Sequence, residues 1–250
     1  MWMAVTGVLF GVFTRTVANW KAQQKSIPET RSAEEVAEYQ RTSARYFIVK
    51  CSVIPFHGIA LTGILLLPWR RRQFPGGFPT QPGHWLLLAC GTWLIVRDCG
   101  DQLIRLLNPL LYQWLGANGL NRVHWFMASA PSLFAAVVVL LSLYAGQSSR
   151  QWRLAMVVLC GGLALQFGSA FVRAIGGPTG PHLSATQTTM TIGDVILCLG
   201  LLLTWVALLR DWQKGVPRDI FHGLGLAAAT ATAGQLVAEV SLLPRLNEWF

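Results

Sequence analysis

Charge is scarce in this sequence. Only 12% of its 250 residues are Asp, Glu, Lys or Arg, whereas soluble domains carry roughly a quarter. Hydrophobic residues make up 53%, which excludes an intrinsically disordered chain. The net charge of +9 comes from Lys and Arg residues scattered between apolar blocks, a distribution that argues against nucleic-acid binding. The composition therefore indicates a polytopic membrane protein whose first partner is the lipid bilayer.

Catalytic and metal-binding motifs are also missing. The five cysteines form no CxxC pair, so neither a thioredoxin-like motif nor a zinc-ligand spacing is present. The sequence contains no HExxH, no GxSxG and no phosphate-binding loop ending in Gly-Lys-Ser/Thr. These absences give no support for an enzyme, and they leave the metal content of the protein open.

Long charge-poor runs replace these motifs. A membrane-spanning helix needs about 20 mostly apolar residues. Six runs meet that requirement, and they cover about residues 46–69, 84–107, 123–145, 154–175, 187–209 and 220–243. The pattern predicts an all-α fold in which residues 46–250 form a six-helix transmembrane bundle.

The N-terminal residues 1–45 have a different pattern. Met1–Thr14 is apolar but too short to cross a bilayer of roughly 30 Å, so we expect an interfacial helix with Trp2 and Trp20 at headgroup level. A short seventh span is the alternative. Ser32 precedes Glu35 by three residues, the spacing of a helix capping box. The polar helix that starts there is expected to run directly into the first span.

Arginine-rich loops predict the orientation. With six spans, loops 70–83, 146–153 and 210–219 lie on the same side and hold eight basic residues. The two opposite loops are nearly bare between the spans. The positive-inside rule therefore places the arginine-rich side in the cytoplasm of a bacterial cell, or in the matrix for a mitochondrial inner membrane.

Most ionisable side chains within the spans lie toward the other side of the membrane. Such groups are rare in bilayers and are functional candidates by default. The sequence therefore predicts a polar site opening to the outer face. Its candidate residues are His57, Arg97, Asp98, Asp101, Arg105, Asp194 and Glu239.

Asp194 is the hardest of these to explain as a surface residue. We place it about seven residues into its span, where a carboxylate requires a cation, a hydrogen-bond donor or protonation. The cluster Arg97–Arg105 has an alternative role, because its charges are spaced to pair with one another at the water interface. Glu239 and Arg173 lie near helix ends and have the alternative of extending to the headgroups.

Histidine positions allow a second hypothesis. A haem with two histidine ligands needs them at matching depth on facing helices. His124 and His182 both lie near the outer face, and His84 and His222 both lie near the inner face. A b-type haem at either level is therefore an alternative, with these four residues as candidate ligands.

Three functions remain compatible with the sequence. The first is transport of a small solute, a proton or a cation through the one-sided polar site. The second is a membrane redox or anchor subunit that binds b-type haem or quinone. The third is a non-catalytic subunit of a larger membrane complex, with partner subunits packed against its tryptophan-rich surface.

Overall fold

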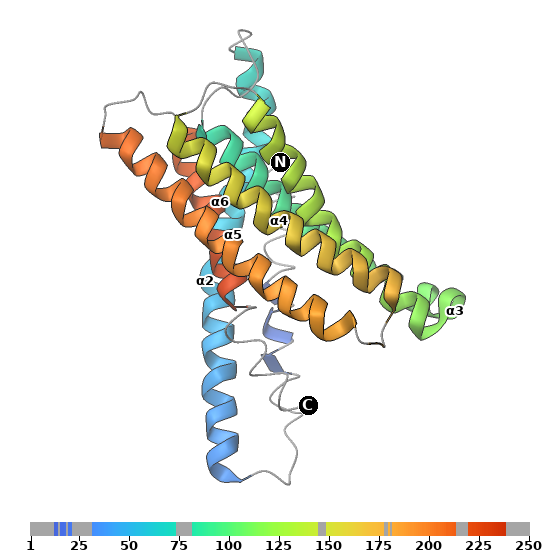
Figure 1. Ribbon diagram of the computed structural model, residues 1–250. Helices are drawn as coiled ribbons and strands as arrows, with labels where there is room; N and C mark the ends of the chain where they lie inside the picture. Colours follow the sequence, from blue (N-terminus) through green and yellow to red (C-terminus); the bar gives the residue numbers. More distant parts are fainter. Residues whose placement is uncertain are drawn as a thin grey trace.

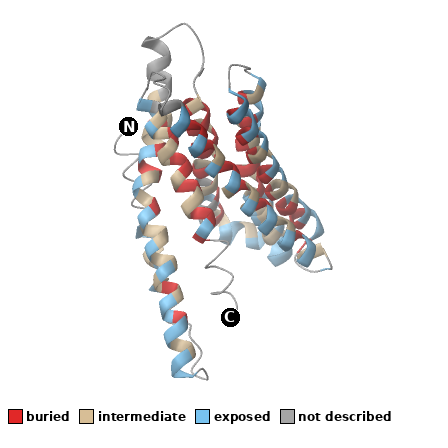
Figure 2. Cartoon of the chain, turned by 60° about the vertical axis from the view of Figure 1, so that its left-hand side comes forward, coloured by how far each residue is buried: buried red, intermediate tan, exposed pale blue. Residues whose placement is uncertain are grey.

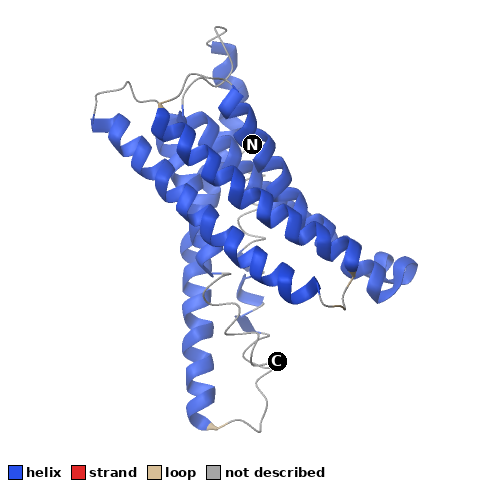
Figure 3. Cartoon of the chain, in the orientation of Figure 1, coloured by secondary structure: helices blue, strands red, loops and turns tan. Residues whose placement is uncertain are grey.

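The computed structural model describes residues 13–14, 16–18, 20–21, 32–73, 82–144, 149–177, 180, 182–213 and 220–238. All regular structure in these ranges is helical (Figure 3), which confirms the all-α prediction for the described part of the chain. The long helices are α2 (Ala33–Gln73), α3 (Pro82–Tyr144), α4 (Arg150–Gly176), α5 (His182–Gln213) and α6 (Ile220–Val237).

Helix α2 joins the polar N-terminal segment to the first apolar run without a break. The capping box at its start is present: the backbone N–H of Ser32 donates to Glu35 Oε2 at 2.9 Å, and the N–H of Glu35 donates to Ser32 Oγ at 3.3 Å. These two bonds satisfy N–H groups that have no partner within the helix. The polar segment and the first span are therefore one helix, as the sequence predicts, and the proposed boundary at residue 45 falls inside it.

Helix α3 consists of two arms joined by a sharp turn at Gly116. This residue has φ 64° and ψ −178°, a backbone conformation that favours glycine. A methyl group added at Gly100 would lie 3.5 Å from Met127 Cε, although 27 residues of straight helix would span about 40 Å. The second arm therefore folds back along the first (Figure 1). The predicted loop between spans 84–107 and 123–145 is helical on both sides of this turn, so that part of the prediction was wrong.

Consecutive segments run in opposite directions, so the end of α2, both ends of α3, the start of α4, the end of α5 and the start of α6 gather at one end of the bundle (Figure 1). Trp152 Nε1, near the start of α4, donates to Ser142 Oγ near the end of α3 at 3.4 Å. A methyl group added at Gly225 near the start of α6 would lie 2.5 Å from the carbonyl oxygen of Gly83 at the start of α3. The Gly116 turn and the turn between α4 and α5 lie at the opposite end.

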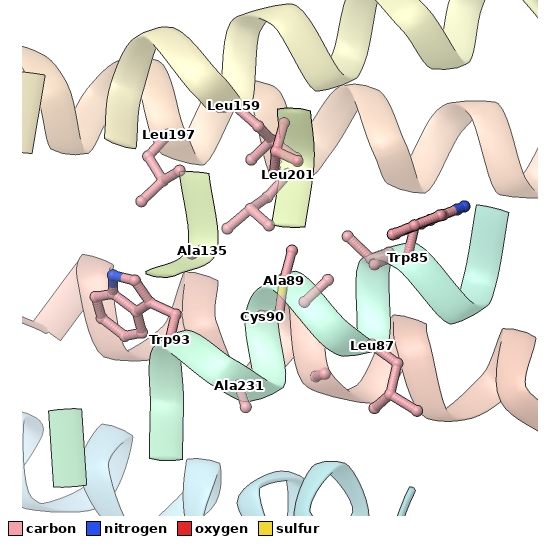
Figure 4. Packing of buried hydrophobic residues seen from close by; sticks show 14 of the residues in the cluster. Trp85, Leu87, Ala89, Cys90, Trp93, Ala135, Leu159, Leu197, Leu201 and Ala231 are labelled. Carbon is pink, nitrogen blue, oxygen red and sulfur yellow. The ribbon is translucent and has the colours of Figure 1, made fainter. Parts of the chain in front are cut away.

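The first arm of α3 occupies the centre of the bundle. Figure 4 shows it passing between side chains of α4 and α5 on one side and α6 on the other. Its buried face includes Trp85, Leu87, Cys90 and Trp93, all in one hydrophobic cluster with Leu159, Leu201 and Ala231. Helix α4 packs mainly against α5 and α3, and α6 packs mainly against α3 and α2.

The outer faces of the bundle are apolar. Figure 2 shows buried positions gathered on the inward faces of the helices. Large apolar side chains are exposed on the outward faces of α4 and α5, among them Leu154, Val157, Ile175, Val195 and Leu202. Polar side chains are buried inside, including Ser132, Gln166 and Thr204. This distribution suits a protein whose surroundings are lipid.

Four helical stretches within the described residues are long and apolar enough to cross a membrane. They are Ala33–Leu66, Leu106–Tyr144, Arg150–Gly176 and His182–Arg210. The predicted runs 84–107 and 220–243 are not among these four. The membrane-protein prediction is confirmed at this level, and the count of six spans stays a prediction.

Candidate functional site

A chain of hydrogen bonds joins three helices in the interior. Ser132 Oγ on the second arm of α3 donates to Gln166 Oε1 on α4 at 2.8 Å. The same amide donates through Nε2 to Asp194 Oδ1 on α5. Ser132 and Gln166 are buried, and Asp194 is half-buried. We call these three residues the Asp194 chain.

Glycines on α4 and α5 bring Gln166 within reach of Asp194. A methyl group added at Gly162 would lie 2.7 Å from the backbone nitrogen of Leu197, and one at Gly193 would lie 3.2 Å from the backbone nitrogen of Gln166. The two helix backbones are therefore in direct contact, the arrangement that small residues permit between membrane helices. Gln166 lies one turn beyond Gly162, and Asp194 follows Gly193 directly.

The Asp194 chain lies near the middle of its helices. Asp194 is two residues from residue 196, the midpoint of the apolar stretch His182–Arg210, and Gln166 is three residues from residue 163, the midpoint of Arg150–Gly176. Because α5 begins at His182, Asp194 lies about 18 Å from its start. The carboxylate is therefore deeper than the seven residues predicted, although it still lies on the His182 side of the midpoint of α5.

The threonines that flank Asp194 in sequence do not supply its partner. Thr188, Thr189 and Thr191 each donate to a backbone carbonyl four residues earlier on α5. Such bonds within a helix use up the single hydroxyl proton of each side chain. Asp194 instead accepts a hydrogen bond from the amide of Gln166 on the neighbouring helix α4.

His57 belongs to a different part of the bundle. It is buried on α2, and its Nδ1 lies 3.1 Å from the carbonyl oxygen of Val53. Helix α2 packs against α6 and α3, whereas α5 packs mainly against α4. The fold therefore does not bring His57 and Asp194 together into the single site that we predicted.

The charge cluster of the predicted site lies on the first arm of α3. Arg97 Cζ lies 4.8 Å from the centroid of the Trp93 ring, a cation–π arrangement. Asp98, Asp101 and Arg105 are helical, but their side chains lie outside the description, as does the whole of Glu239. The roles of these four residues in a polar site stay predictions.

The four candidate haem ligands lie at the two ends of the bundle. Gly83 and Gly225, beside His84 and His222, are in backbone contact, which leaves no space for a macrocycle between α3 and α6 there. At the other end His124 is exposed, and His182 Nε2 lies 3.3 Å from the carbonyl oxygen of Gly177. Among the described residues, no group of three or more His, Cys, Asp and Glu side chains is placed to hold a metal ion.

The side chain of Arg173 does not take the orientation toward the headgroups that the sequence analysis considered for it. Instead of extending along α4 to the headgroups, it is buried against α5. Its Nε donates to Thr186 Oγ1 at 2.8 Å, and its Nη2 donates to Leu183 O at 3.1 Å and to Gln187 Oε1 at 2.7 Å. The guanidinium thereby joins the end of α4 to the start of α5.

Two members of the Asp194 chain are not apparent from the sequence. Ser132 and Gln166 are uncharged, so a search for ionisable residues in apolar runs passes over them. Gln166 does leave one signal, because it is the only side-chain amide in the run 154–175. A buried amide needs partners for both its oxygen and its nitrogen, and within an apolar run those partners lie on neighbouring helices.

Comparisons with protein families, with curated proteins and with solved structures find no match for this chain.

Proposed function

We propose that the chain is a six-pass membrane protein that moves a proton, or a cation or small solute with it, by means of Asp194. The six passes are α2, the two arms of α3, α4, α5 and α6. Their alternating directions support this count. The first arm of α3 is surrounded by other helices, so its burial comes from packing within the bundle.

The arginine-rich end of the bundle is proposed to face the cytoplasm or matrix. The helix ends that flank loops 70–83, 146–153 and 210–219 lie together at that end. Arg150, Arg153 and Arg210 are exposed there. The positive-inside rule then orients the Gly116 turn and the turn between α4 and α5 to the outside.

The observation that carries the proposal is a carboxylate near the middle of α5 that accepts a hydrogen bond from the neutral amide of Gln166. An acidic side chain at the centre of a membrane helix costs about 2.5–3.5 kcal/mol on insertion scales. An asparagine at position 194 would accept the same bond from Gln166 Nε2 without that cost. What asparagine lacks is the ability to take up and release a proton, or to neutralise a cation.

Gln166 is a positioning residue in this proposal. Its amide fixes Asp194 Oδ1, and its own oxygen is held by Ser132. A neutral amide has no readily exchanged proton to pass along, so the Asp194 chain orients the carboxylate and does not conduct protons. Protonation of Asp194 weakens it as an acceptor for the amide. Because this hydrogen bond joins α4 to α5, protonation of Asp194 weakens the contact between the two helices.

Proton flux into proteoliposomes tests the proposal. The purified full chain is reconstituted with a pH-sensitive dye inside, and a potassium diffusion potential drives protons inward. We expect Asp194→Asn to reduce the initial rate at least tenfold, about to the level of empty liposomes. The control is Thr191→Val, an exposed position on the same helix, which should retain the wild-type rate. A wild-type rate in Asp194→Asn would refute the role of the carboxylate.

A further inference from the structure

Arg173 carries a buried charge whose hydrogen-bond partners among the described residues are all neutral. Its side chain is only 7% exposed. Its hydrogen-bond acceptors are a hydroxyl, a backbone carbonyl and an amide, and its Cζ lies 4.6 Å from the centroid of the Trp125 ring. Nη1 makes no hydrogen bond within the described part of the chain. A buried cation held only by neutral groups favours an anion beside it.

A second guanidinium, that of Arg122, lies beside Gly177 at the end of α4. Arg122 is exposed, and a methyl group added at Gly177 would lie 3.6 Å from its Nη2 and 3.7 Å from its Nε. Arg122 and Trp125 are neighbours on one face of α3, three residues apart. Arg173 and Gly177 are likewise one turn apart at the end of α4. The two arginines therefore approach the turn from adjacent helices.

The start of α5 adds to the positive potential. This helix of 32 residues begins at His182, and its first turn contains no acidic residue. The N-terminus of a long helix carries a partial positive charge and favours anions. No described carboxylate forms an ion pair with Arg122 or Arg173.

We propose that Arg122 and Arg173 bind a phosphate group beside Gly177, between the end of α4 and the start of α5. The tetrahedral oxygens of a phosphate can accept from Nη1 of Arg173, whose Nε and Nη2 already have partners, and from the guanidinium fork of Arg122 at once. The turn lies where the apolar stretches of α4 and α5 end, which is the level of lipid headgroups. The phosphate belongs either to an anionic lipid or to a soluble compound that enters from the aqueous side. This site is separate from Asp194 and does not depend on transport.

Thermal unfolding of the full chain in a neutral detergent tests the site. The delipidated protein is titrated with phosphatidylglycerol, with diacylglycerol of the same acyl chains, and with inorganic phosphate. We expect one or both phosphate-bearing probes to raise the unfolding midpoint, and diacylglycerol to leave it unchanged. A response to phosphatidylglycerol alone assigns the site to lipid. A response to inorganic phosphate assigns it to a soluble phosphate compound.

Two variants make the test specific. Arg122→Gln changes an exposed side chain that makes no hydrogen bond within the described residues, so the variant should fold. It should require about tenfold more of the phosphate-bearing probe than wild type to reach half of the maximal rise in the unfolding midpoint. Arg153→Gln removes the same charge from an exposed position at the other end of α4 and should respond as wild type. The absence of a shift with either phosphate probe, or an equal response in Arg122→Gln and wild type, would overturn the proposal.

Discussion

A side chain that is buried in a membrane protein must find its hydrogen-bond partners within the protein. Gln166 does so with both ends of its amide, using Ser132 on one side and Asp194 on the other. Asp194 is conspicuous in the sequence because it is charged, and it could be predicted as a site residue. Its partners could not, since a serine or glutamine within an apolar run does not indicate which neighbouring helix it faces.

Removal of the bridging amide should destabilise the bundle. Gln166→Leu leaves the Ser132 hydroxyl and the Asp194 carboxylate without this partner, and we expect a loss of about 1–2 kcal/mol in the free energy of unfolding. Unfolding in mixed detergent micelles, followed by circular dichroism, measures the change. Ser169→Ala is the control, because among the described residues the Ser169 hydroxyl bonds only to Leu165 O of its own helix. Equal stability of Gln166→Leu and wild type would show that the bridge contributes nothing.

Helices α2 and α3 show what hydropathy can and cannot locate. The apolar runs were placed well, but α2 begins thirteen residues before its predicted span, and α3 continues through the predicted loop to the turn at Gly116. Hydropathy distinguishes segments that lie in lipid from segments that lie in water. It does not mark where a helix ends, because polar residues such as Gln113 and Asn118 can also form a helix in water. The ends of these helices are set by local chemistry: the capping box at Ser32 and the positive φ of Gly116.

Close packing of α4 on α5 should depend on Gly162. The methyl group of Gly162→Ala would lie 2.7 Å from the backbone of Leu197, so the helices must separate. We expect a loss of about 1–3 kcal/mol, measured as a lower unfolding midpoint. The neighbouring Gly161 has nothing within 4 Å of the added group, so Gly161→Ala is a matched control that should be neutral or slightly stabilising. A similar midpoint for the two variants would contradict the glycine contact.

Across the whole molecule, the sequence predicted the alternation of helix direction but not which segment is central. The first arm of α3 was predicted as one span among six, yet its buried face lies in one hydrophobic cluster with side chains of α4, α5 and α6. Small residues such as Gly83, Ala89 and Gly225 allow this close approach, and their partners lie far away in sequence. Such pairings depend on the three-dimensional arrangement and could not be read from periodicity alone.

The alternation predicts opposite accessibility at the two ends of the bundle. Single cysteines at Ser149 and at Asn118, both exposed positions, are introduced into a chain whose five native cysteines are replaced. In oriented vesicles, an impermeant thiol reagent should label one of the two from the outside, and label the other only after the membrane is permeabilised. Labelling of both sites from the same side would rule out the six-pass arrangement.

The role of Asp194 can be observed directly by infrared difference spectroscopy of the protein in lipid bilayers. Spectra recorded at acid and alkaline pH contain the carbonyl band of each carboxylic acid that takes up a proton between them. A carboxylate that exchanges protons in the interior should give a band that is present in wild type and in Thr191→Val and missing in Asp194→Asn. If the spectra of wild type and Asp194→Asn coincide, Asp194 takes up no proton, and proton transport through this residue is wrong.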